Sequence, residues 1–174
     1  MSEAATKLNL PDISKIPGHV SKAIVNAFGV QLSCKVSAVK MSLDHSTLNK
    51  YSIDCVSTLA MRSSTVLGLL CLGFPKASFL GVVEKMIGEK VEDVTSENSD
   101  ASSEILNIVF SSARKPINED GFDFDPAIPT TLIGSNLSLA KSNLTGQSLF
   151  FECTSEIGPF LVVLALKHKG PNDR

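Results

Sequence analysis

The apolar run Thr65–Phe74 constrains this chain more than any other feature of its sequence, because it contains no charged residue. A run of about ten residues is too short to span a bilayer, for which a helix needs about 20. Arg62-Ser63-Ser64 before the run is a turn signal, and Pro75 after it suits the start of a helix. The run therefore predicts a well-buried strand in the centre of a sheet, with a second layer packed over it.

Alternating apolar and polar residues predict the neighbouring strands. Before the run, Val30–Ala38 and Tyr51–Leu59 alternate in this way, and the turn at Arg62–Ser64 joins the second of them to Thr65–Phe74 as a hairpin. Three further strands are expected later in the chain, at Ile128–Ser135, Ser148–Thr154 and Phe160–His168.

Three helices are expected between these strands, over residues 17–28, 75–87 and 99–114. Pro17 and Pro75 suit the first turn of a helix, where the missing N–H costs no hydrogen bond. Gly29 and Gly88 are expected to stop the first two helices, and Pro116 is expected to close the third. The predicted order is one helix, three strands, two helices and three strands.

The first and third predicted helices resemble each other. When Phe28 is aligned with Phe110, His19–Phe28 superposes on Ala101–Phe110, and each helix precedes a three-strand unit. We therefore expect a layered α+β fold in which pseudo-duplicated helix plus three-strand units form a mostly antiparallel six-stranded sheet with helices packed on it. One domain is expected over residues 17–170, with halves near 17–74 and 75–170, after an N-terminal leader of residues 1–16.

Composition argues against several classes of protein. The formal net charge of −2 leaves no broad basic surface for nucleic acid, and the apolar fraction of 43% suits an ordinary globular core. The four cysteines are scattered, with no CxxC pair and no histidine at ligand spacing, so we expect buried thiols and no metal site. No GxSxG motif, Cys/His pair or phosphate-binding glycine loop supports a small-molecule hydrolase. The first residues hold no apolar segment typical of a secretory signal, so a cytoplasmic location is expected.

The third predicted helix carries a polar stripe. On a wheel of about 100° per residue, Asp100, Asn107 and Ser111 fall within about 60° of Glu104, and Arg114 lies beside them. The opposite side of this helix is apolar, so the stripe should face water. Many helices expose Glu and Asn only for solubility, and the spacing alone therefore indicates no function.

The sequence around this polar stripe resembles that of the CheC/CheX/FliY phosphatase family. The segment Asp100-Ala-Ser-Ser-Glu104-Ile-Leu-Asn107 is similar to the family signature, which is Asp or Ser, three residues, Glu, two residues and Asn. Three further stretches look like the segments around that signature, namely Thr65–Ala77, Met86–Gly88 and Ile128–Gly134. The resemblance extends from about residue 17 to 168, and it implies the six-stranded fold already expected from the pattern.

The resemblance also implies an activity. Family members remove the phosphoryl group from an aspartate of a CheY-like response regulator, so Asn107 is expected to orient the attacking water and Glu104 to pair with the regulator's active-site lysine. The remaining stripe residues and one neighbour are expected to contact the partner, namely Asp100, Ser103, Ser111 and Arg114. Mg²⁺ is expected on the regulator and no cofactor on this chain.

Within the family, CheX-like members carry one Glu/Asn pair and CheC-like members carry two. The first helix here has Lys22 and Val25 at the positions that align with Glu104 and Asn107, so one CheX-like site is expected. Ser111 departs from the glycine that is frequent one turn after the Asn, and this small side chain bears on how closely a partner can approach.

Two further expectations accompany the resemblance. The alternative function is a non-catalytic module of the CheX or flagellar-switch type, which would serve in binding or dimerisation within a signalling pathway. CheX-like proteins form homodimers through sheet edges, and Thr65–Phe74 or Phe160–His168 is expected to supply such an edge.

Overall fold

The computed structural model describes residues 12–138 and 146–170. Its sheet has six strands in the order β1-β5-β6-β3-β2-β4, and every neighbouring pair is antiparallel. The strands are β1 Val36–Ser42, β2 Ile53–Arg62, β3 Val66–Phe74, β4 Thr130–Leu137, β5 Gln147–Ser155 and β6 Gly158–His168. The helices are the 3₁₀ segments η1 Ile13–Lys15 and η2 His45–Lys50, and the α-helices α1 Ile16–Leu32, α2 Lys76–Ile87 and α3 Asp100–Glu119.

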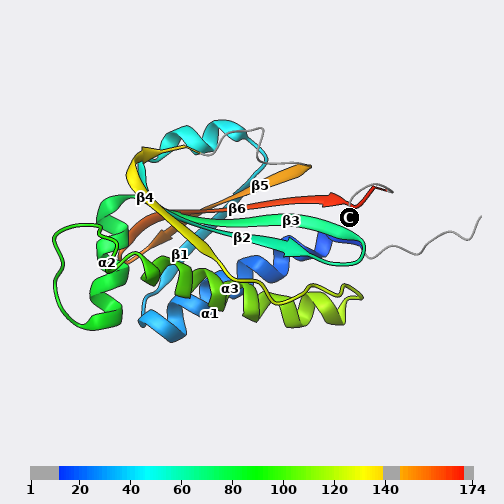
Figure 1. Cartoon of the computed structure of the whole chain (residues 1–174), viewed down its shortest axis with the longest axis horizontal. Coiled ribbons are helices and arrows are strands. Elements are labelled where there is room, and N and C mark those ends of the chain that lie inside the picture. Colours follow the sequence, from blue (N-terminus) through cyan, green and yellow to red (C-terminus); the bar gives the residue numbers. More distant parts are fainter. Residues whose placement is uncertain (1–11, 139–145, 171–174) are drawn as a thin grey trace, which may run out of the picture.

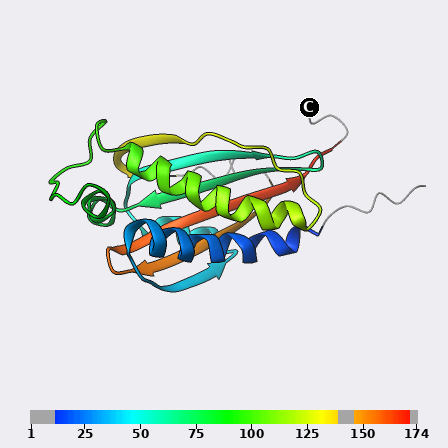
Figure 2. The same cartoon turned by 90° about the horizontal axis from the view of Figure 1, so that it is seen from below.

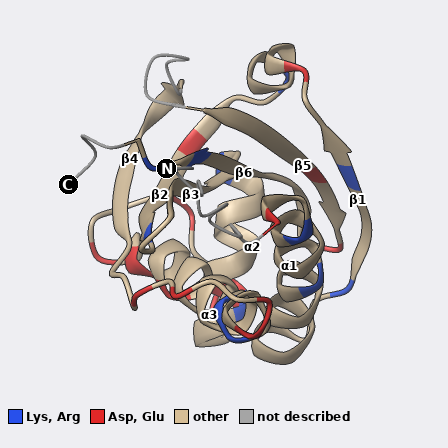
Figure 3. Cartoon of the chain, turned by 90° about the vertical axis from the view of Figure 1, so that its right-hand side faces the viewer, with Lys and Arg blue, Asp and Glu red and all other residues tan. Residues whose placement is uncertain are grey.

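Helices α1 and α3 form a layer on one face of the sheet, and α2 stands at one end of that layer (Figure 1). Seen from below, α1 and α3 run side by side in opposite directions (Figure 2). The view along these helices shows β1 and β4 as the two edges of the curved sheet (Figure 3). The predicted layered α+β architecture is therefore confirmed.

The strand order itself reflects the duplication. If each element of the unit α1-β1-β2-β3 is exchanged for its counterpart in α3-β4-β5-β6, the order β1-β5-β6-β3-β2-β4 is reversed and otherwise unchanged. Phe28 and Phe110, which align between the two helices, are both buried in the core. The two halves are thus related by pseudo-twofold symmetry, as the alignment of the first and third helices predicts.

The core lies mainly between the sheet and the helical layer. Phe28 of α1 stacks on Phe160 of β6 with ring centroids 4.3 Å apart, and Phe74 of β3 lies 5.6 Å from the Phe160 ring. A smaller apolar cluster covers the opposite face of the sheet around Val56, Cys71 and Phe150. The strand β3 is buried between β2 and β6, which is the central position that the apolar run predicts.

The predicted end of the first helix is wrong. Helix α1 continues through Gly29 to Leu32, and β1 begins only at Val36, so the strand expected from Val30 starts six residues late. Gly29 is solvent-exposed and adopts ordinary helical geometry, whereas Ser33 takes the left-handed conformation with φ +45° and donates its N–H to Phe28 O. The helix therefore ends at a serine that has no sequence signature of a stop.

The third helix also extends beyond its expected end. It passes through Pro116 to Glu119, although a proline inside a helix removes one N–H from the hydrogen-bond ladder and crowds the carbonyl four residues earlier. Ile117 is buried and holds this last turn on the core, and the Asp120 N–H reaches back to Pro116 O at 3.2 Å.

The strands expected to serve as dimer edges lie in the middle of the sheet. β3 pairs with β2 and β6, and β6 pairs with β3 and β5, so their backbone groups are already used. The free edges belong to β1 and β4 instead. Of the expected N-terminal leader, residues 1–11 lie outside the described part of the chain.

Candidate functional site

Helix α3 is fixed to the rest of the molecule by one apolar side. Its first turn carries Asp100, whose negative charge suits the positive end of a helix dipole. The buried residues recur at helical spacing and pack on α1 and on the sheet, namely Ile105, Leu106, Val109, Phe110, Ala113 and Ile117. This packing decides which side of α3 faces solvent.

The solvent side of α3 carries the predicted pair. Glu104 and Asn107 are both exposed, with Asp100 and Ser111 also exposed on the same side and Arg114 half-buried. Residues three apart on a helix have Cβ atoms about 5–6 Å apart, so the carboxylate and the carboxamide can contact one ligand together. We call the side chains of these five residues the α3 ridge.

The side chains of Glu104 and Asn107 point to solvent without a partner in residues 12–138 and 146–170. Among the described residues, no hydrogen bond or ion pair involves either side chain. Both are therefore available to an external partner. Ser103 differs, because it is half-buried and donates its hydroxyl to Asp100 O at 2.8 Å. The structure thus brings five of the six predicted residues onto the ridge and leaves Ser103 at its side.

The equivalent side of α1 is exposed but lacks this chemistry. Lys22 is exposed, and Val25 leaves 44% of its surface accessible. A lysine reverses the charge of Glu104, and a valine can neither donate nor accept a hydrogen bond. The pseudo-twofold symmetry therefore gives α1 and α3 equivalent exposed sides, and the exposed side of α3 carries the Glu/Asn pair.

A buried polar contact that sequence reasoning missed lies under α3. Ser102 is fully buried on the apolar side of the helix, and its hydroxyl lies 2.7 Å from Ser57 Oγ of β2. Ser57 Oγ also lies 2.6 Å from Thr131 Oγ1 of β4. Burial raises the pKa of the neighbouring Cys55 thiol to about 11, so that thiol stays neutral. These hydroxyls tie α3 to two strands and help fix the rotation of the ridge.

Two hollows flank the ridge. The first has a volume of about 380 Å³ and extends from Asp100 and Glu104 to α2 and to the loop after it. The second is a more open hollow at the other end, lined by Ser111 and Arg114 and by the last turn of α3. Asn107 lies between them and lines neither. A partner that covers Asn107 can therefore reach both hollows.

An enclosed apolar cavity lies remote from the ridge. It has a volume of about 80 Å³ and lies on the opposite face of the sheet, between η2, β4 and the central strands. Cys71 is the titratable group among the described residues that line it, and burial raises the pKa of this thiol to about 12, so the thiol is a poor nucleophile. The described lining of this cavity thus presents no pair of groups suited to hydrolysis.

The described part of the chain offers neither a metal site nor a membrane span. Within residues 12–138 and 146–170, no three His, Cys, Asp or Glu side chains are grouped so that they could hold a metal ion. No helix in those ranges combines the length and the apolar character needed to cross a membrane. All four cysteines are buried and unpaired, as their sequence context predicts.

Several solved structures share this fold. A CheC-like superfamily protein from Shewanella sp. PV-4 is 23% identical with a TM-score of 0.79, and the alignment covers 88% of this chain and 97% of that one. The chemotaxis protein CheX from Vibrio vulnificus is 20% identical with a TM-score of 0.79, and the alignment covers 88% and 99%. At these identities the likeness establishes a common fold.

A third similar structure contains a partner. It is the CheX–CheY–BeF3–Mg²⁺ complex from Borrelia burgdorferi, which is 16% identical with a TM-score of 0.66 over 87% of this chain and 97% of that one. No curated protein matches the sequence. The family model for the chemotaxis phosphatase CheX matches residues 56–154, a range that includes the whole of α3 and more than half of the chain. The chain therefore belongs to the CheX family of chemotaxis phosphatases.

Proposed function

We propose that this protein hydrolyses the phospho-aspartate of a CheY-like response regulator, with Asn107 orienting the attacking water and Glu104 pairing with the regulator's active-site lysine. The family supports phosphatase chemistry, and the Borrelia complex supports a CheY partner. The observation that carries the proposal is the α3 ridge, where Glu104 and Asn107 are exposed one turn apart and no described residue binds their side chains.

The carboxamide of Asn107 suits this reaction. In the hydrolysis, the water oxygen bonds to phosphorus, the bond from phosphorus to the aspartyl oxygen breaks, and the products are the carboxylate and inorganic phosphate. An acyl phosphate is already reactive, so catalysis consists mainly of placing the water in line with the leaving oxygen. The amide oxygen can accept a hydrogen bond from that water, and the group stays neutral beside the anionic phosphoryl.

Glu104 provides the charge that Asn107 lacks. A carboxylate one turn away can reach a lysine on the regulator and align the ridge with the phosphoryl group. A charge-assisted hydrogen bond of this kind contributes about 1.5–3 kcal/mol when it is partly desolvated. Asp100, Ser111 and Arg114 extend the same contact along the ridge, and Ser103 lies at its margin.

Mg²⁺ in this proposal belongs to the regulator, and the Borrelia complex, in which CheX and CheY occur together with BeF3 and Mg²⁺, supports that assignment. This chain contributes the two side chains and the surface that excludes bulk water. A homodimer, if it forms through sheet edges, has β1 and β4 as its available strands.

Phosphate release from candidate phosphorylated regulators tests the proposal. We expect the protein to accelerate dephosphorylation of one regulator far above its spontaneous rate, at a catalytic amount of protein. If the protein binds that regulator but leaves its phosphorylation lifetime unchanged, the non-catalytic binding module is the correct alternative.

A further inference from the structure

We propose that the hollow beside Glu104 is a second docking element for the same regulator, and that it receives an apolar side chain of the regulator flanked by Lys or Arg. We call this hollow the α2–α3 groove and define it by Met86, Ile87, Val91, Glu97, Asp100 and Glu104. The inference rests on the proposed function, because the occupant is a segment of the regulator that Asn107 serves.

The floor of the groove is apolar and open to solvent. Ile87, in the last turn of α2, exposes 57% of its surface. Met86 and Val91 are half-buried beside it and pack on the main core. An exposed apolar surface within a hollow of about 380 Å³ favours burial against a partner's side chain.

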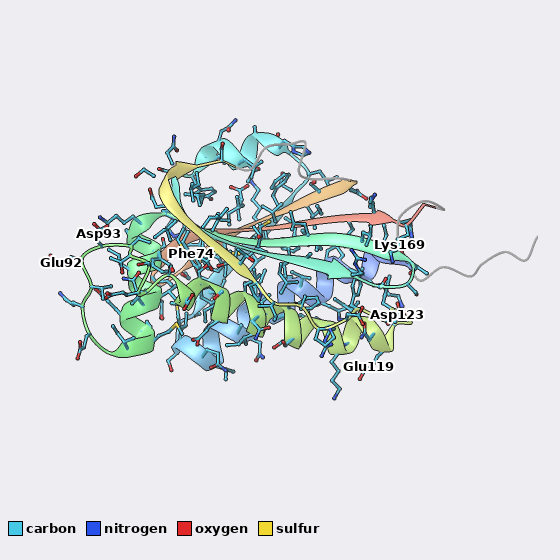
Figure 4. All side chains as sticks on the ribbon, viewed as in Figure 1. Phe74, Glu92, Asp93, Glu119, Asp123 and Lys169 are labelled. Atoms are coloured by element: carbon cyan, nitrogen blue, oxygen red, sulfur yellow. The ribbon has the colours of Figure 1, made fainter. Side chains whose placement is uncertain are left out.

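The rim of the groove is acidic. Glu97, Asp100 and Glu104 line it, and none of the three forms an ion pair with a described residue. The charge is also concentrated in this region, since residues 84–104 contain seven Asp or Glu and two Lys while the whole chain has a net charge of only −2. Figure 4 shows Glu92 and Asp93 of this region on the loop beyond α2. An apolar side chain flanked by cations therefore complements the groove in both respects.

The loop that forms the rim is held by its own hydrogen bonds. Asn98 accepts the Thr95 N–H at 2.9 Å and donates its amide to Asp93 O at 2.9 Å. Lys76 at the start of α2 forms an ion pair with Asp93 at 2.8 Å. Because these contacts set the loop before a partner arrives, less ordering entropy is lost on binding.

The α2–α3 groove adjoins the α3 ridge. Glu104 belongs to both, whereas Asn107 lies outside the groove. One partner can therefore insert a side chain in the groove while its phosphoryl group meets Asn107. Affinity and turnover should accordingly respond to different substitutions, and this separation makes the inference testable.

The test uses the full chain with the phosphorylated regulator that it dephosphorylates. We expect Ile87→Glu to raise KM about tenfold or more, with kcat at saturating regulator changed less than about twofold, because the substitution places a charge where an apolar group is buried. Ile87→Leu keeps the apolar surface and should behave as wild type. Leu43→Glu is the matched control, since Leu43 is 56% exposed and follows β1 at the opposite edge of the sheet from β4.

A second measurement examines the rim. Glu97→Gln, a change in the groove that lies outside the α3 ridge, should weaken binding of the BeF3-activated regulator at low ionic strength, and the difference from wild type should diminish as salt is added. Circular dichroism and thermal unfolding establish that each variant is folded.

The results separate the two proposals. If Ile87→Glu binds and turns over the regulator as wild type does while Asn107→Ala abolishes hydrolysis, the groove proposal is overturned and the phosphatase proposal stands. If Ile87→Glu weakens binding but Asn107→Ala hydrolyses at the wild-type rate, the groove is supported and the catalytic assignment is overturned.

Discussion

His19 Nε2 lies 2.8 Å from a carboxylate oxygen of Asp120, so the first turn of α1 is bonded to the residue that ends α3. Lys15 Nζ approaches the other oxygen of the same carboxylate at 3.4 Å. Because α1 and α3 run in opposite directions, this contact joins the start of one helix to the end of the other. It holds the end of α3 that lies furthest from the acidic loop.

The first prediction concerns Asp120. Its pKa is lowered, mainly by the hydrogen bond from His19 and also by Lys15. A carboxyl group with a lowered pKa in the folded state stabilises that state above its unfolded pKa, and the contribution is lost as the pH falls through the folded value. Asp120→Asn should therefore lower the free energy of unfolding near neutral pH, with a smaller effect near pH ~3.

Urea unfolding at the two pH values measures this difference. Glu119→Gln removes the same charge from the neighbouring residue and serves as the control. A loss of stability in Asp120→Asn that is equal at both pH values would contradict the electrostatic explanation.

The second prediction concerns Asn107. Asn107→Ala should lower kcat about a hundredfold or more while the dissociation constant of the BeF3-activated regulator stays close to wild type, because water positioning is lost and most of the interface remains. Asn107→Asp keeps the shape of the side chain and should also be slow, since its charge repels the phosphoryl group. Single-turnover loss of labelled phosphate measures both. Wild-type rates in Asn107→Ala would show that the catalytic assignment is wrong.

The third prediction concerns Glu104. Glu104→Lys should chiefly weaken binding, because two positive groups would meet at the regulator's lysine. Isothermal titration with the BeF3-activated regulator measures the effect, and Glu119→Lys provides a charge reversal at the far end of α3. Exchange of the regulator's lysine for glutamate should restore part of the affinity of Glu104→Lys. If the exchange restores nothing, the two residues do not pair.

The fourth prediction concerns the buried hydroxyls under α3. Ser102→Ala should cost about 0.5–1.5 kcal/mol of stability, the usual net value of one hydrogen bond, because Ser57 keeps its contact with Thr131. Ser102→Leu should cost more, about 1–3 kcal/mol, since a larger side chain must displace the helix from the sheet. Chemical denaturation measures both. Equal stability of the two variants would mean that the site has room that the packing does not indicate.

Much of the fold follows from local pattern. The run Thr65–Phe74 predicts its own central position, because an uncharged strand between two turn signals has to be covered on both faces. The end of α1 could not be predicted in this way, since Gly29 allows a stop without requiring one. The chain instead turns at Ser33, where the buried Leu32 and Cys34 on either side fix its direction.

The candidate site likewise has one part that local sequence pattern predicts and another that only the folded structure reveals. Glu104 and Asn107 could be placed on an exposed side because a helix repeats every 3.6 residues and the apolar residues of α3 occupy the other side. Ser102 could not be recognised, since its partner Ser57 is 45 residues away in another element. The α2–α3 groove needs Ile87 and Glu104 together, and only the folded loop between α2 and α3 brings them there.

The strand order reads the same when the two halves are exchanged, so α1 offers a second surface on which the pair proposed for catalysis on α3 can be built. The core side of α1 is already built, with Ala23, Ile24 and Phe28 buried as their counterparts on α3 are. Exchanging Lys22 for glutamate and Val25 for asparagine would change two residues of the exposed side of α1 and leave that core side unchanged. A chain that carries both exchanges should serve two regulators at once, one on each helix, and its turnover per molecule should rise toward twice that of the parent.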